Sequence, residues 1–160
     1  ARALALAFGK TEERTAENLM NQLATTLGLT QTYFTNPTGL DYFDKIQSAE
    51  SSAKDLSLLF THILANYPEL FAATTKSQVT ATTLEAKVYV GQNTNKLVSQ
   101  TPGVLASKTG FTEVAGGNLV MALDRGLGQP IIAVVLGSST DGRFTDMAEL
   151  IRRTMKYFSL

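Results

Sequence analysis

Three apolar segments follow one another closely near the end of the chain, and the short loops between them constrain the fold more than any other feature. The segments are VLASKTGFT, GGNLVMALDR and QPIIAVVLGSS. Runs rich in β-branched and apolar residues, bounded by glycine and proline, are typical of strands. A parallel return needs a crossover of a dozen or more residues, so strands joined this briefly must run antiparallel. The sequence therefore predicts an antiparallel meander.

Helical patterns lie on both sides of this meander. Residues 13–27 carry apolar side chains at helical spacing, with Gly28 as a natural stop; the stripe is Ala16, Leu19, Met20, Leu23 and Leu27. SSAKDLSLLFTHILANYPEL predicts a second helix, with Ser52 as N-cap and an end before Pro68. FTDMAELIRRTMKYF predicts a closing helix. The segments SQVTATT, EAKVYVG and NTNKLV suggest short strands and connections. This order indicates an α+β fold, with residues 1–160 as a single domain.

Composition excludes several classes of function. The 160 residues include 14 basic and 14 acidic side chains, so no net field attracts nucleic acid or an anionic membrane. The absence of cysteine excludes disulfides, thiol catalysis and zinc–thiolate sites. His62 is the only histidine, which excludes a histidine-rich metal site, and we expect it to be structural or solvated. We expect no metal and no organic cofactor.

A formal Ser-x-x-Lys pattern occurs at Ser51 to Lys54. In such a pattern a helical turn places a serine hydroxyl under a lysine amine that can accept its proton. The alternative is that Ser51 and Ser52 begin a helix and that Lys54 is a solvated side chain of the first turn. Capping accounts for every residue here, so we favour this alternative.

The triplet Lys108-Thr109-Gly110 lies within the first strand of the meander, and we expect Ala115 to Gly117 to form the turn that follows this strand. Alternation along a strand would direct Lys108 and Gly110 to one face and Thr109 to the other. Gly110 leaves room for a ligand or another backbone, and a strand at a sheet edge can pair with an extended peptide. The alternative is a surface strand with a solvated lysine. The triplet alone leaves both interpretations open.

Several segments, taken in chain order, resemble one family, the serine-type D-alanyl-D-alanine carboxypeptidases, which are the low-molecular-mass penicillin-binding proteins of bacteria. The segments are LMNQLATTLGLTQTYFTNPTGLD, SSAKDLSLLFTHILANYPEL, NTNKLV, SKTGFTEVAGGNLVMAL and IIAVVLGSSTDGRF. The resemblance implies a penicillin-binding transpeptidase/β-lactamase-like fold, an antiparallel sheet flanked by helices. It also implies an acyl-enzyme route that removes the terminal D-alanine from peptidoglycan stem peptides, and binding of β-lactam antibiotics. Such a protein would act outside the cytoplasmic membrane.

The resemblance also bears on the nucleophile. In the family, Ser-x-x-Lys lies upstream of the loop that corresponds to residues 36–41, whereas Ser51 lies downstream of it, so this order rejects Ser51. No Ser-x-Asn motif is recognisable, and ARALALA resembles the helix that follows that motif in the family. We therefore expect an N-terminally truncated chain, the larger C-terminal part of the catalytic domain. It would be inactive by itself, with the missing N-terminal part as a possible partner.

The resemblance implies that one side of the family's substrate site, the Lys-Thr-Gly strand, is present in this chain. Lys108 would supply charge and a hydrogen bond, Thr109 a hydroxyl for a carboxylate, and Gly110 clearance. The backbone N–H of Phe111 would donate to an oxyanion, and Arg143 would help hold the substrate carboxylate.

The sequence departs from the family at two positions. Thr94 and Thr38 stand where some members have arginine and histidine, so carboxylate recognition would depend more on Arg143. Two alternatives remain: a non-catalytic module that binds peptidoglycan peptides, and a β-lactamase or endopeptidase on the same fold.

Overall fold

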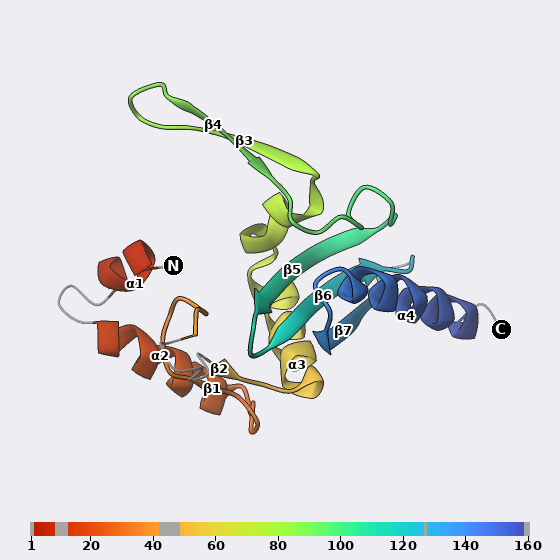
Figure 1. Cartoon of the computed structure of the whole chain (residues 1–160), viewed down its shortest axis with the longest axis horizontal. Helices are drawn as coiled ribbons and strands as arrows, with labels where there is room; N and C mark the ends of the chain where they lie inside the picture. The colour runs from red at the N-terminus through yellow and green to blue at the C-terminus, as the bar shows by residue number, and fades with distance from the viewer. Residues whose placement is uncertain (1, 9–12, 42–48, 127, 159–160) are drawn as a thin grey trace. The chain divides into compact units, whose positions relative to one another are not determined.

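The computed structural model describes residues 2–8, 13–41, 49–126 and 128–158 (Figure 1). The chain divides into two compact units. Unit 1 comprises residues 1–59 and 112–115, and unit 2 comprises residues 60–111 and 116–160. The expected single domain over residues 1–160 stays a prediction. No helix within the described ranges is long and apolar enough to cross a membrane.

Unit 1 is mainly helical. Its elements are α1 (Arg2–Phe8), α2 (Glu13–Thr26), the paired strands β1 (Tyr33–Phe34) and β2 (Ala49–Glu50), and the first residues of α3 (Ala53–Asn66). The predicted helix over residues 13–27 is therefore present. It ends as predicted, because Gly28 adopts a φ of 70°, in the left-handed region that suits glycine. The Ser52 hydroxyl accepts a hydrogen bond from the Asp55 amide at 3.1 Å, which confirms the predicted N-cap of α3.

The apolar stripe of α2 is only partly buried within unit 1. Ala16 is 7% exposed, whereas Leu19 and Leu23 keep 47% and 48% of their surface exposed. The two leucines line an open apolar groove with Leu4 and Pro37. Helical spacing thus identified the apolar face but not how much of it unit 1 covers.

Unit 2 contains the sheet. After the end of α3 come the 3₁₀ helix η1 (Pro68–Thr75), the hairpin strands β3 (Gln78–Thr82) and β4 (Val88–Gln92), the strands β5 (Val104–Thr112), β6 (Gly116–Asp124) and β7 (Pro130–Ser138), and the helix α4 (Gly142–Phe158). Strands β5, β6 and β7 form one sheet in that order. The β6–β7 pairing is antiparallel, with Met121 opposite Ala133. The predicted meander and closing helix are both present.

The core of unit 2 lies between this sheet and α4. Strand β6 is buried on both faces, since Leu119, Met121 and Leu123 on one face and Val120 and Ala122 on the other are at most 5% exposed. The first face packs against α4 in one cluster; its buried members are Leu97, Leu119, Met121, Leu123, Ala133, Phe144 and Met147. The sheet is therefore fixed by its central strand, and β5 is placed by pairing with it.

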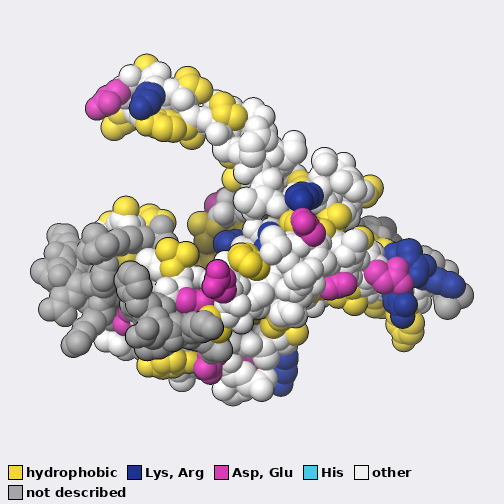
Figure 2. Space-filling model, in the orientation of Figure 1, with side chains coloured by type: hydrophobic (Ala, Val, Ile, Leu, Met, Phe, Trp, Pro, Cys, Tyr) yellow, Lys and Arg dark blue, Asp and Glu magenta, His cyan; other side chains and the backbone are white. Residues whose placement is uncertain are grey.

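The β3–β4 hairpin and the segment after it differ in structure. The hairpin carries exposed apolar side chains, among them Val88, Tyr89 and Val90, along its length (Figure 2). The segment NTNKLV forms turns, so it is a connection rather than a strand. In it the Asn93 side chain accepts the Asn95 amide at 2.9 Å, and this local bond competes with strand pairing.

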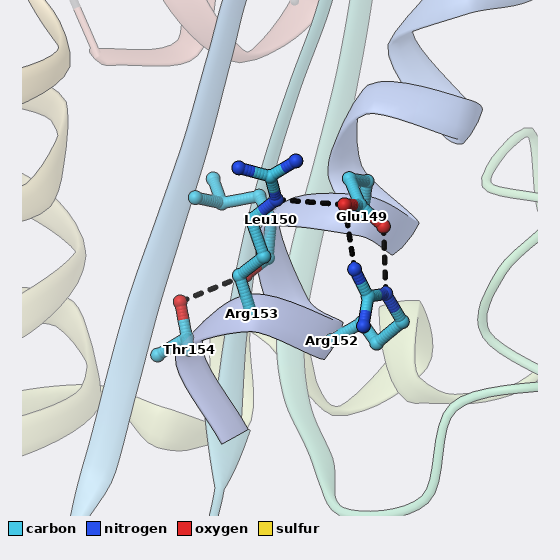
Figure 3. A network of polar contacts seen from close by, with 5 residues as sticks. All are labelled: Glu149, Leu150, Arg152, Arg153 and Thr154. Carbon is cyan, nitrogen blue, oxygen red and sulfur yellow. Dashed lines mark hydrogen bonds and ion pairs between the residues drawn. The ribbon is translucent and has the colours of Figure 1, made fainter. Parts of the chain in front are cut away.

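The exposed face of α4 carries a charged cluster (Figure 3). The Glu149 carboxylate accepts hydrogen bonds from Nε and Nη2 of Arg152 at 2.7 and 2.8 Å, and from Nε of Arg153 at 2.7 Å. The hydrogen bonds from Arg152 and then Arg153 lower the pKa of Glu149 to about 2. Glu149 is therefore ionised throughout the neutral pH range.

Candidate functional site

Strand β5 presents Lys108, Thr109 and Gly110 from unit 2. Lys108 is exposed, while Thr109 and Gly110 are half-buried, so accessibility does not alternate strictly along the strand. Ser107, just before the triplet, is 2% exposed. Its amide donates to Thr74 Oγ1 at 3.0 Å and its hydroxyl donates to the Thr74 carbonyl at 3.2 Å. These bonds attach β5 to the end of η1 and hold the triplet in place.

Two cations donate to the main chain of this strand. The Lys108 ammonium bonds the Thr109 carbonyl at 2.5 Å, and Arg143 Nη1 bonds the Gly110 carbonyl at 2.7 Å. Arg143 is only 9% exposed and its guanidinium lies 4.8 Å from the centre of the Phe144 ring. Its Nε has no partner within the described structure. The predicted carboxylate-binding arginine thus holds the strand that carries the triplet.

Thr94 contacts the same strand through its hydroxyl. Thr94 Oγ1 lies 2.6 Å from Thr109 Oγ1, a short hydrogen bond between two hydroxyl groups. The turn that presents Thr94 is anchored by Asn93, whose Nδ2 donates to the carbonyls of Thr74 and Lys76, each at 2.9 Å. The backbone that presents the exposed Thr94 hydroxyl is therefore held in place by hydrogen bonds.

An exposed ion pair lies beside this turn. Lys96 Nζ donates to Asp141 Oδ1 at 2.9 Å and lies 5.3 Å from the centre of the Phe144 ring. The hydrogen bond from Lys96 lowers the pKa of Asp141, and the charge of Arg143 acts in the same direction. This pair connects the NTNKLV segment to the start of α4.

Gly110 leaves open space that the described residues do not fill. A Cβ atom built on Gly110 would find its nearest heavy atom, Cβ of Asn118, at 3.8 Å, which is ordinary van der Waals contact. The packing of the chain therefore does not require glycine here. Gly110 is half-buried and yet open at the Cβ position, and its role as clearance for a ligand stays a prediction.

The hairpin after the triplet differs from the prediction in detail. The sequence interpretation assigned Ala115 to Gly117 to the turn, whereas the structure has the turn at residues 113–115 and begins β6 at Gly116. Gly116 has a φ of 67°, and a Cβ there would lie 2.8 Å from the Ser138 carbonyl oxygen. The glycines serve the approach of β6 to β7 rather than the turn itself.

The Ser-x-x-Lys pattern in unit 1 forms no serine–lysine pair. The Ser51 hydroxyl lies 2.9 Å from the Thr32 hydroxyl, and the Ser52 hydroxyl caps α3. Lys54 is exposed. The capping interpretation is therefore correct for the described structure.

The structure brings together four predicted residues, Lys108, Thr109, Gly110 and Arg143, and Phe111 follows them with 50% of its surface exposed. Sequence reasoning missed the direct contact of Thr94 with Thr109. The Asn-Thr-Asn pattern, with an amide on each side that can bond the backbone, was the available signal. Within the described ranges, no cluster of three or more His, Asp or Glu side chains could hold a metal ion.

Comparison with known proteins adds independent information. A family model described as D-alanyl-D-alanine carboxypeptidase matches residues 3–140. D-alanyl-D-alanine carboxypeptidase DacC of Escherichia coli is 34% identical over 142 residues, which are 88% of this chain and 33% of that protein.

Solved structures give the same result. Penicillin-binding protein D2 of Listeria monocytogenes, in its cefotaxime-bound form, is 31% identical with a TM-score of 0.73, over 88% of this chain and 54% of that one. The Streptomyces K15 DD-transpeptidase is 28% identical with a TM-score of 0.69, over 87% of this chain and 53% of that one. These likenesses confirm the fold predicted from the sequence. The chain spans about half the length of the solved structures and less of the curated relatives.

Proposed function

Because this chain belongs to the D-alanyl-D-alanine carboxypeptidase family, we propose that it supplies one wall of the substrate site of a serine-type D-Ala-D-Ala carboxypeptidase. The substrate is a peptidoglycan stem peptide that ends in D-Ala-D-Ala. The observation that carries the proposal is the Lys108-Thr109-Gly110 strand, whose Gly110 carbonyl is held by Arg143 at 2.7 Å. Acting on peptidoglycan places the protein outside the cytoplasmic membrane.

Each residue of this wall has a proposed role. Lys108 contributes positive charge, and the Thr109 hydroxyl donates to the terminal carboxylate of the substrate. Gly110 lets the peptide backbone approach β5 closely. The amide of Phe111 donates to the oxyanion of the tetrahedral intermediate, a contribution of about 3 kcal/mol in other acyl-transfer enzymes. Arg143 adds positive charge for the carboxylate and positions the strand through its bond to Gly110.

We propose that the nucleophilic serine of this acyl-enzyme reaction lies outside these 160 residues. Within the chain, Ser51 is paired with Thr32 and Ser52 caps a helix, so neither hydroxyl is activated by a lysine. The chain by itself then binds but does not hydrolyse its substrate, and the nucleophile comes from the part of the domain that precedes residue 1. Binding of β-lactams is proposed on the same basis, since a relative was solved with cefotaxime bound.

Covalent labelling with a fluorescent penicillin tests where the nucleophile lies. The 160-residue chain should show no adduct by mass spectrometry, whereas the longer gene product should be labelled at a serine upstream of it. An adduct at Ser51 of the short chain would overturn this assignment. Failure of the longer product to label would remove the support for the enzyme.

Peptide binding tests the wall itself. Titration of the chain with an N-acetylated D-Ala-D-Ala peptide, followed by NMR, should shift the amide signals of Lys108 to Phe111. Gly110→Ala should weaken this binding without lowering the stability of the chain, because the protein leaves space for the added methyl group. Equal binding by wild type and variant would contradict a close approach of the peptide to β5.

A non-catalytic binding module is the second candidate, since a strand such as Lys108-Thr109-Gly110 can bind a peptide through its main chain without any catalytic step. It predicts that the longer gene product binds the D-Ala-D-Ala peptide without releasing D-alanine. Release of D-alanine would decide for the carboxypeptidase. A β-lactamase or endopeptidase on the same fold would instead hydrolyse penicillin or cleave a peptide cross-link in the same assay.

A further inference from the structure

The contact between Thr94 and Thr109 has no role in the function proposed above. Their hydroxyl oxygens lie 2.6 Å apart, although the residues are 15 positions apart in the chain. Each hydroxyl has one proton. One proton lies between the two oxygens, so the pair keeps one further O–H group that can donate to a third atom.

The backbone of the Thr94 turn is held from both sides. Asn93 bonds two carbonyls beyond the turn, those of Thr74 and Lys76. Asn95 is 3% exposed, and its side-chain oxygen accepts the amide of Leu97 at 3.0 Å. Thr94 itself is exposed between these two anchored asparagines. Its hydroxyl therefore reaches Thr109 from a fixed position.

The cations around the pair are engaged with the main chain of β5. Lys108 Nζ donates to the Thr109 carbonyl and Arg143 Nη1 donates to the Gly110 carbonyl. Thr94 is uncharged, so its contact with Thr109 is a hydrogen bond between two neutral hydroxyl groups. Any ligand that binds the hydroxyl pair would therefore be recognised through directed hydrogen bonds rather than through an additional charge.

We propose that Thr94 is a positioning residue that determines specificity for a ligand carboxylate by orienting the Thr109 hydroxyl. A carboxylate only accepts hydrogen bonds, so Thr109 can serve it only as a donor. The hydrogen in the 2.6 Å contact then comes from Thr94. In that arrangement Thr94 donates to Thr109, and Thr109 donates to the carboxylate, which strengthens both bonds. This inference rests on the proposed function.

The experiment compares two ligands with the full 160-residue chain: an N-acetylated D-Ala-D-Ala peptide and its C-terminal amide, which lacks the charged carboxylate. NMR titration gives the ratio of their dissociation constants. Thr94→Val keeps the shape of the side chain and removes the hydroxyl, whereas Thr94→Ser keeps the hydroxyl. Thr80→Val, on exposed β3, is the matched control.

We expect wild type to prefer the free acid over the amide. Thr94→Val should reduce this preference about three- to tenfold, the effect of one net hydrogen bond. Thr94→Ser and Thr80→Val should keep it. A reduced preference with unchanged melting temperature distinguishes orientation of Thr109 from a general loss of structure.

Each other outcome overturns the inference in a recognisable way. An unchanged ratio in Thr94→Val, with binding intact, would reject the role of Thr94 and leave the proposed function in place. An equal loss in the Val and Ser variants would show that keeping the hydroxyl does not keep the preference, and would reject orientation of Thr109 by that hydroxyl. Absence of binding of either peptide to wild type would reject the binding wall of the proposed function together with the inference.

Discussion

The two units differ in which large side chains are fully buried among the described residues. In unit 2 these side chains are Leu119, Met121, Leu123 and Met147, whereas in unit 1 the fully buried side chain is Asp55. Unit 2 is stabilised by an apolar core between a sheet and a helix. In unit 1 the most buried large side chain is instead a carboxylate, and two leucines of α2 stay half exposed. Apolar side chains therefore contribute differently to the free energy of unfolding in the two units, because their burial depends on what packs against them.

The largest expected effect comes from a matched pair of leucines. Leu119→Ala in unit 2 removes a side chain with 0% exposure. It should lower the free energy of unfolding by about 2–5 kcal/mol, which is the usual effect of a Leu→Ala change in a core. Leu23→Ala in unit 1 should cost less than about 1 kcal/mol, since Leu23 is 48% exposed and alanine favours the helix. Urea denaturation measures both variants. Equal losses would show that the face of α2 is covered in solution.

The next effect concerns the buried carboxylate. Asp55 Oδ2 accepts hydrogen bonds from the Gln31 amide at 2.7 Å and from the Thr32 hydroxyl at 2.8 Å. Asp55→Ala leaves both donors without this acceptor and should destabilise unit 1 by about 2–3 kcal/mol. Hydrogen exchange should show faster exchange at Gln31 but not at the β6 amides of unit 2. The control is Glu69→Ala, which removes the same charge from an exposed position, and a similar effect there would contradict the buried role of Asp55.

The smallest effect concerns an exposed carboxylate in unit 2. The hydrogen bonds from Arg152 and Arg153 hold the pKa of Glu149 at about 2, below its ordinary value of 4.5. A lowered pKa in the folded state stabilises the protein above pH 4.5, and this contribution is lost as the pH falls through about 2. Glu149→Gln should therefore lower the melting temperature slightly at pH 7, and this difference should shrink as the pH falls toward 2 and vanish below it. A difference as large at pH 2 as at pH 7 would rule out the ion pairs as its cause.

Prediction from the sequence succeeded where the signal is local. The N-cap at Ser52, the stop at Gly28 and the closing helix all follow from residues within a few positions of one another. The partial burial of α2 could not be predicted, because helical spacing defines an apolar face and does not show what packs against it. The glycines after Ala115 were assigned to a turn, whereas the backbone of β7 requires them at the start of β6.

The candidate site divides in the same way. The sequence identified the Lys108-Thr109-Gly110 strand, since a short apolar run followed by a glycine can be recognised from consecutive residues. It named Arg143 for a carboxylate, which stays a prediction, and it did not predict the bond from the guanidinium to the Gly110 carbonyl, 33 positions away. It noted Thr94 only as a departure from the family and did not predict the contact with Thr109.

The sequence by itself determined the types of element, the antiparallel order of the strands and the residues of strand β5, because periodicity and loop length act through neighbouring residues. Only the tertiary structure decided which hydroxyl meets Thr109 and which carbonyl Arg143 holds. These contacts join segments far apart in the chain, and their geometry depends on how β6 and α4 pack in the core of unit 2.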